Sequence, residues 1–190
     1  MPEITGVLLA AGQSKRFGGN KLLTEIDKRA MVLHAAASLS ACDRLLAVVR
    51  REDLAIQQLL QVASIKLVIN DAADQGMGSS IACGVAASQQ SHGWCLLPAD
   101  MPFVKPATTL EVISALKQGA TLAAPFYQNR RGHPVGFGHE LTSELLALDN
   151  EPGARRIVSQ YQQRLVMINS NDEGVLVDID TPDDLKQALL

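Results

Sequence analysis

The chain has 190 residues, of which 47% are hydrophobic and 19% are charged. A chain of this size and composition can build one proper hydrophobic core, so we expect a single domain over residues 1–190 and exclude intrinsic disorder. Seventeen Lys and Arg against twenty Asp and Glu give a formal net charge of −3, with no long run of either sign. This balance argues against a protein that binds nucleic acid through many phosphates.

The N-terminal sequence MPEITGVLLAAG carries an acid at Glu3. Its apolar run of roughly seven residues is too short to span a membrane, and it lacks the cationic start of a signal peptide. We therefore expect a cytoplasmic protein with no membrane partner.

Short runs rich in Val, Ile and Leu alternate with segments of helical length and composition. This alternation predicts a three-layer α/β/α fold whose mostly parallel sheet is covered by helices on both faces. The predicted strands are residues 4–10, 45–49, 66–69, 94–97, 121–125, 135–137, 165–168 and 175–179. The predicted helices are residues 30–41, 52–62, 79–89 and 107–118, with shorter helical stretches at 140–148 and 153–161.

A loop rich in glycine and cations follows the first predicted strand, in the segment AAGQSKRFGGNK of residues 10–21. Glycines let backbone N–H groups approach phosphate oxygens closely, while Arg16 and Lys21 can neutralise a triphosphate at the carboxyl end of the strand. The segment matches neither the P-loop pattern nor GxGxxG. A solvated basic loop is the alternative interpretation.

A second glycine-rich segment, QGMGSS of residues 75–80, lies between a predicted strand and a predicted helix. Ser79 or Ser80 is interpreted first as the N-cap of that helix and second as a contact to a nucleotide base or sugar.

Carboxylates follow two further predicted strands. Asp100 stands in the stiff turn Pro98-Ala-Asp-Met-Pro102, and alternation along a strand puts Asp178 and Asp180 on one side. Two carboxylate positions with few other donors suit Mg²⁺, which completes its coordination with water and phosphate oxygens. Asp180-Thr181-Pro182 also has the pattern of a helix start with Thr181 or Asp180 as the cap, and both interpretations can hold together.

Two smaller motifs are open to two interpretations each. His133, in GHPVGF, is either a structural histidine or a substrate contact. Arg155 and Arg156, in GARR, either reach a second anionic substrate or form a solvated basic turn.

Taken together and in this order, LLAAGQSKRFGGNKLL, QGMGSS, LPADMP, GHPVGF, GARRI and DIDTPDD resemble the nucleotidyltransferase family that includes the molybdenum cofactor guanylyl- and cytidylyltransferases, across about residues 4–188. The resemblance implies a Rossmann-like sheet, a catalytic role for Lys21, Arg16 and Asp100, and Mg²⁺ on Asp100 and Asp180, with Asp178 as a substitute for Asp180. The nucleotide-binding residues that it implies are Leu9, Ala10, Ala11, Gly12, Ser14, Arg16, Lys21, Ser79 and Ser80.

Cytidylyl members of that family are similar to this chain in having AAG in the first loop, whereas guanylyl members have AGG. The resemblance thus points to CTP, to molybdopterin carrying molybdenum as the acceptor held by His133, Arg155 and Arg156, and to a molybdoenzyme that receives the product. A different phosphorylated acceptor, such as a sugar phosphate, is one alternative. A non-catalytic carrier of nucleotide or cofactor is the other.

Overall fold

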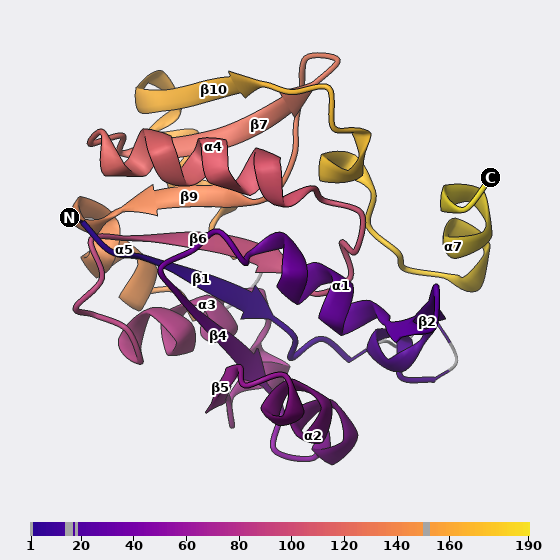
Figure 1. Ribbon diagram of the computed structural model, residues 1–190. Helices are drawn as coiled ribbons and strands as arrows, with labels where there is room; N and C mark the ends of the chain where they lie inside the picture. The colour runs from indigo at the N-terminus through magenta and orange to yellow at the C-terminus, as the bar shows by residue number, and fades with distance from the viewer. Residues whose placement is uncertain (1, 14–16, 18, 150–152) are drawn as a thin grey trace.

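The computed structural model describes residues 2–13, 17, 19–149 and 153–190, and a mixed sheet runs through its middle (Figure 1). The strand order is β10-β7-β9-β6-β1-β4-β5, and β8 pairs with β7 beside this path. The strands are β1 Ile4–Leu9, β4 Arg44–Val49, β5 Lys66–Ile69, β6 Gly93–Pro98, β7 Leu122–Tyr127, β8 Arg130–Arg131, β9 Val135–Gly138 and β10 Leu165–Asn169.

Strand β1 lies between β4 and β6 in the sheet. It pairs in parallel with β4 on one side and with β6 on the other, so that Val7 lies opposite both Leu46 and Leu96. β5 continues the parallel arrangement beyond β4. β9 is antiparallel to its neighbours β6 and β7, while β10 is parallel to β7. The sheet is therefore mostly parallel, as predicted.

Helices cover both faces of the sheet, because the buried strands carry apolar side chains on both sides. Ile4 and Leu8 of β1 pack in one core cluster with α1, α2 and α4, whereas Val7 packs in the other with α3, α5 and α6. The helices are α1 Met31–Ser38, α2 Leu54–Val62, α3 Met77–Ala86, α4 Pro106–Lys117, α5 Thr142–Leu146 and α6 Arg155–Gln160. This arrangement confirms the three-layer prediction.

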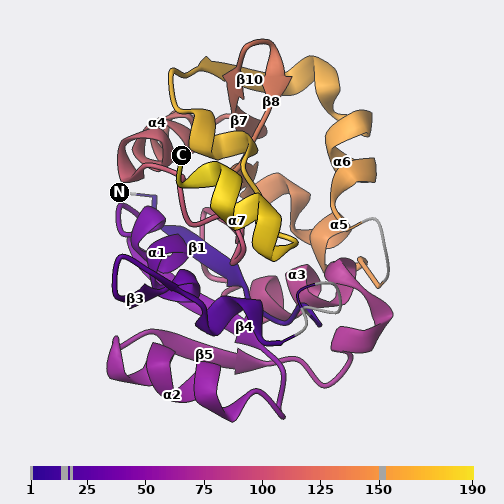
Figure 2. The ribbon, with the colours of Figure 1, turned by 90° about the vertical axis from the view of Figure 1, so that its right-hand side faces the viewer.

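Short elements fill the connections. They are the hairpin of β2 Glu25–Ile26 and β3 Arg29–Ala30, the terminal helix α7 Pro182–Ala188, and the 3₁₀ turns η1 Lys21–Leu23, η2 Ala73–Gln75, η3 His139–Leu141, η4 Gln162–Arg164 and η5 Glu173–Leu176. Figure 2 looks towards the edge of the sheet at which β1 and β4 end, and α7 lies in front of this edge. Within the described ranges, no helix combines the length and the apolar character needed to cross a bilayer.

The predicted strand at residues 175–179 is wrong. The chain forms η5 and then continues without a strand, although Val175 and Ile179 are fully buried as their apolar character suggests. Asp172 accepts a hydrogen bond from the Gly174 backbone N–H, which starts the turn, and the Val175 carbonyl accepts from the backbone N–H of His133. The segment is therefore held by single hydrogen bonds, and it packs into the core without pairing with a strand of the sheet.

Candidate functional site

A cavity of about 510 Å³ opens at the carboxyl ends of β1 and β6. It is lined by the end of β1 with the loop up to residue 13, by the start of η1, by residues 73–77 with Ser80, and by the turn after β6 together with Asp180. The chain leads from β1 into α1 on one face of the sheet and from η2 into α3 on the other. Segments that diverge in this way over parallel strand ends leave the kind of crevice in which α/β proteins bind ligands.

Lys21 joins the two carboxylates of the cavity. Its Nζ lies 2.7 Å from Oδ2 of Asp100 and 3.0 Å from Oδ1 of Asp180. Burial by itself lowers the pKa of Lys21, but the charges and hydrogen bonds of Asp100 and Asp180 outweigh it, so the pKa lies above its ordinary 10.5. The side chain is therefore an ammonium ion at neutral pH, held between two acids.

Local structure explains why Asp100 and Asp180 meet. The backbone N–H of Ile179 donates to the carbonyl of Asp100 at 2.9 Å, so the two segments are tied next to their carboxylates. On the far side, the backbone N–H of Asp180 donates to Oδ2 of Asp184 at 3.0 Å. Thr181 and Asp184 form a capping box at the start of α7, which confirms Thr181 as the predicted helix cap. Asp180 is thus fixed between a buried Ile179 and a capped helix.

The structure separates Asp178 from Asp180. Because residues 175–179 form no strand, the predicted alternation that places both acids on one side does not apply. Asp180 lies against Lys21, whereas Asp178 is exposed and its charge acts on His133, where it only partly offsets the burial that lowers the pKa of that histidine. Asp180 is therefore the acid that shares the cavity with Asp100.

The first loop contributes part of the cavity wall. Leu9, Ala11 and Gly12 line it, while Ala10 is fully buried behind it, with its N–H donating to the Val48 carbonyl at 2.9 Å. The predicted contacts Ser14 and Arg16 lie outside the described residues.

The N-cap interpretation of Ser79 and Ser80 is wrong. Helix α3 begins at Met77 with Gly76 as its N-cap, and Gly76 has φ 120°, a left-handed conformation that favours glycine. Ser79 Oγ donates to the carbonyls of Ala72 and Gly76, and the Asn70 amide donates to the hydroxyls of both serines. Ser80 lines the cavity and Ser79 does not.

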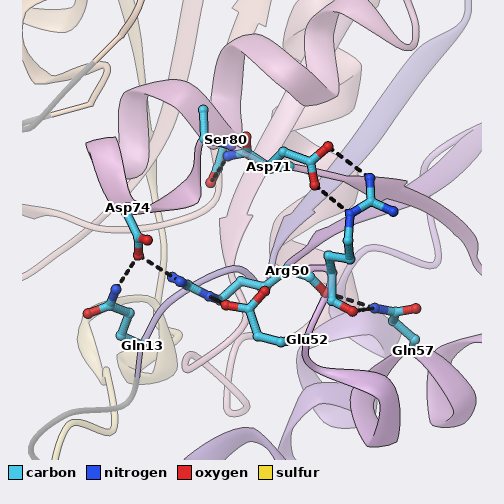
Figure 3. A network of polar contacts seen from close by, with 10 residues as sticks. Gln13, Arg50, Glu52, Gln57, Asp71, Asp74 and Ser80 are labelled. Carbon is cyan, nitrogen blue, oxygen red and sulfur yellow. Dashed lines mark hydrogen bonds and ion pairs between the residues drawn. The ribbon is translucent and has the colours of Figure 1, made fainter.

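Sequence reasoning missed a polar network on the rim, shown in Figure 3. Asp74 Oδ1 accepts hydrogen bonds from Gln13 Nε2 and from Arg50 Nη2, and both Gln13 and Asp74 line the cavity. The position of Asp74 beside the QGMGSS segment was an available signal for it. No local pattern marks Arg50, because its partner lies 24 residues away in the chain.

The predicted acceptor residues His133, Arg155 and Arg156 do not line the cavity. His133 is partly buried, and burial first, then the charge of Arg131, lowers its pKa to about 4. Its Nδ1 has no hydrogen-bond partner among the described residues. Arg155 is the first residue of α6. Its positive charge adds to the effect of burial in lowering the pKa of Arg131.

Arg155 and Arg156 follow Gly153, and a Cβ added at Gly153 would lie 3.4 Å from Met77 of the cavity wall. Neither arginine has an ion pair to a carboxylate within the part of the chain that is described. The two arginines are exposed at the start of α6, just after a glycine that packs against the cavity wall.

Known proteins share this architecture. Rv0371c from Mycobacterium tuberculosis aligns with a TM-score of 0.85 at 24% identity, covering 99% of this chain and 97% of that structure. Nicotine blue oxidoreductase from Paenarthrobacter nicotinovorans is 27% identical over 199 aligned residues, which cover 100% of this chain and 98% of that protein. A molybdenum cofactor guanylyltransferase from Shewanella frigidimarina is 29% identical, covering 98% and 95%.

The fold is the α/β fold of the nucleotidyltransferases. The family model described as the MobA-like NTP transferase domain matches residues 6–165. The chain therefore belongs to the MobA-like NTP transferase family, and the resemblance predicted from its motifs is confirmed. Asp180 lies beyond the matched range, so its place in the site comes from the geometry alone.

Proposed function

We propose that this protein is a metal-dependent cytidylyltransferase that transfers CMP from CTP to molybdopterin carrying molybdenum, giving the cytosine dinucleotide cofactor and pyrophosphate in the cytoplasm. The observation that carries the proposal is the pairing of Lys21 with Asp100 and Asp180 inside a cavity walled by the glycine-containing first loop. One buried cation beside two acids at a strand end suits a ligand that brings both phosphates and a metal ion.

Asp100 and Asp180 fit a divalent ion. The Lys21 ammonium already lies within 3.0 Å of both carboxylates, so a small cation reaches both from one position. Two hard oxygen ligands suit Mg²⁺, because this ion keeps several waters and takes phosphate oxygens from its substrate. Bound there, the ion would neutralise the triphosphate and stabilise the negative charge that develops during transfer.

The residues of the chain supply positioning and charge. An oxygen of the acceptor phosphate attacks the α-phosphorus of CTP, the new O–P bond forms, and the bond to the bridging oxygen of the pyrophosphate breaks. No protein nucleophile is required. Lys21 and Arg16 stabilise the departing pyrophosphate, while Leu9, Ala11, Gly12, Ser14 and Ser80 hold the nucleoside and its phosphates. Ala10 and Ser79, which do not line the cavity, support these segments from behind.

The choice of CTP rests on the AAG of the first loop, because the family resemblance associates AGG with guanylyl transfer. The relative from Shewanella is named a guanylyltransferase at 29% identity, so the base preference needs a direct test. On the acceptor side, we assign the anionic group of the pterin to Arg155 and Arg156 and a further contact to His133. A molybdoenzyme then receives the product.

The test is pyrophosphate release by the purified protein with Mg²⁺ and each of the four ribonucleoside triphosphates, with and without molybdopterin carrying molybdenum. Release with CTP only when the pterin is present is the expected result. Release with GTP instead would overturn the base assignment. Release only with a sugar phosphate would overturn the acceptor, and binding of CTP without turnover on any acceptor would favour a carrier.

A further inference from the structure

Arg50 makes the central contact of the rim network. It directly follows β4, and its guanidinium places Nη2 2.6 Å from Asp74 Oδ1 and Nε 2.6 Å from Glu52 Oε1. Its side chain is only 12% exposed, although it carries a full charge. Figure 3 shows how Arg50 points from the end of its strand towards Asp74, with Gln13 on the other side of that carboxylate.

The backbone that carries Arg50 is itself held. Gln57 of α2 donates from its amide to the carbonyls of Arg50 and Arg51, at 2.8 and 3.0 Å. Arg50 is therefore anchored to a helix at one end and to Asp74 at the other. Gln13 lies on the loop after β1 and Asp74 lies in η2, and both residues line the cavity. The hydrogen bonds from Gln13 and Arg50 to Asp74 therefore connect two walls of the cavity to the anchored Arg50.

We infer that Arg50 is a positioning residue for the nucleoside triphosphate, an inference that rests on the proposed nucleotidyl transfer. Arg50 fixes Asp74, and Asp74 fixes Gln13, so the start of the first loop, up to residue 13, is already placed when the triphosphate enters. Arg50 also offsets the negative charge of Asp74, which otherwise faces a cavity that must accept a polyanion. Both effects strengthen nucleotide binding, and neither touches the reacting atoms.

The neighbouring residue offers a matched control. Arg51 binds Asp71 with two hydrogen bonds of 2.8 Å, and this pair joins the same two segments of the chain. Arg51 and Asp71 are well exposed, at 70% and 65%, and neither lines the cavity. Loss of this pair removes a similar ion pair between the same segments but leaves the nucleotide site alone.

The experiment compares Arg50→Gln with Arg51→Gln by calorimetric titration of whichever ribonucleoside triphosphate the wild-type protein binds most tightly, with Mg²⁺ and without acceptor. Loss of a charge-assisted network contact predicts roughly tenfold weaker binding for Arg50→Gln, and a change of less than about twofold for Arg51→Gln. In turnover assays the KM for the nucleotide should rise in Arg50→Gln while kcat is largely kept.

A second comparison tests the route through Asp74. If Arg50 acts by fixing that carboxylate, Arg50→Gln should add little further loss of affinity in an Asp74→Asn background. Unchanged binding in Arg50→Gln, an equal loss in Arg51→Gln, or full additivity with Asp74→Asn would each overturn the inference while leaving the proposed function intact. Failure of the wild-type protein to bind any triphosphate would overturn both.

Discussion

Replacement of Lys21 by Met should strengthen metal binding in the absence of nucleotide and lower turnover. Methionine keeps the unbranched apolar stem but removes the ammonium that lies 2.7 Å from Asp100 and 3.0 Å from Asp180. A divalent ion entering the wild-type site must compete with this ammonium for both carboxylates. In Lys21→Met the competitor is gone, so the ion alone should bind more tightly.

The structure sets the size of this effect. The two carboxylates are 23% and 30% exposed, so each ion pair is worth far less than a fully buried one. Pairs of this kind contribute about 1 kcal/mol or less each, which gives about 1–2 kcal/mol for two and a roughly five- to thirtyfold gain in metal affinity. Turnover should move the other way, falling by about 10²–10³, because Lys21 no longer stabilises the leaving pyrophosphate.

Mn²⁺ titration followed by electron paramagnetic resonance measures the first quantity directly, in protein without nucleotide. Lys186→Met is the matched control, since it removes an ammonium from an exposed pair with Asp183 on α7 and should leave Mn²⁺ affinity unchanged. Circular dichroism checks that each variant is folded. Equal or weaker Mn²⁺ binding in folded Lys21→Met would refute the competition between the ammonium and the metal.

Three further predictions concern the site and its support. Asp100→Asn should lower pyrophosphate release by at least about 10² while lowering the melting temperature by no more than about 4 °C, and near-normal turnover would remove Asp100 from the mechanism. Gly132→Ala should destabilise the fold by about 1–3 kcal/mol in urea unfolding, because the new Cβ would lie 2.5 Å from the Val175 carbonyl oxygen; an unchanged midpoint would show that the turn yields easily. The wild-type protein should lose about 2 kcal/mol of stability between pH 7.5 and 5, because His133 has a pKa of about 4 when folded and takes up its proton near pH 6.5 only when unfolded. His133→Asn should lack this part of the loss, and an identical pH profile would contradict the assignment.

Apolar runs predicted most of the strands, because a strand that is buried on both faces is apolar along nearly its whole length. The run at residues 175–179 has the same composition, yet it forms no strand. A strand requires a partner with free backbone groups, and that requirement depends on contacts far away in the chain. A local sign was present in Asp172 and Gly174, because the Asp172 carboxylate accepts a hydrogen bond from the Gly174 backbone N–H and starts a turn.

The site residues differ in the same way: some stand in recognisable local motifs, and others reach the site only through contacts between distant parts of the chain. Lys21 and Asp100 stand in motifs whose local chemistry is visible, next to glycines or between prolines. Arg50 stands at the end of an ordinary strand, and only the folded chain shows that its charge reaches Asp74. The start of α3 differs from the prediction for a local reason: Gly76, with φ 120°, occupies the N-cap position without a side-chain cap, and the helix begins before the serines.

Because β1 lies between β4 and β6, the cavity has one set of polar contacts on the β4 side and another on the β6 side. Arg50 follows β4 and, through Asp74, holds Gln13 at the start of the loop that leaves β1, whereas Asp100 follows β6 and meets Lys21. If the proposed function holds, a triphosphate in the cavity would have its positioning contacts from Arg50 and Asp74 towards β4 and its metal contacts towards β6.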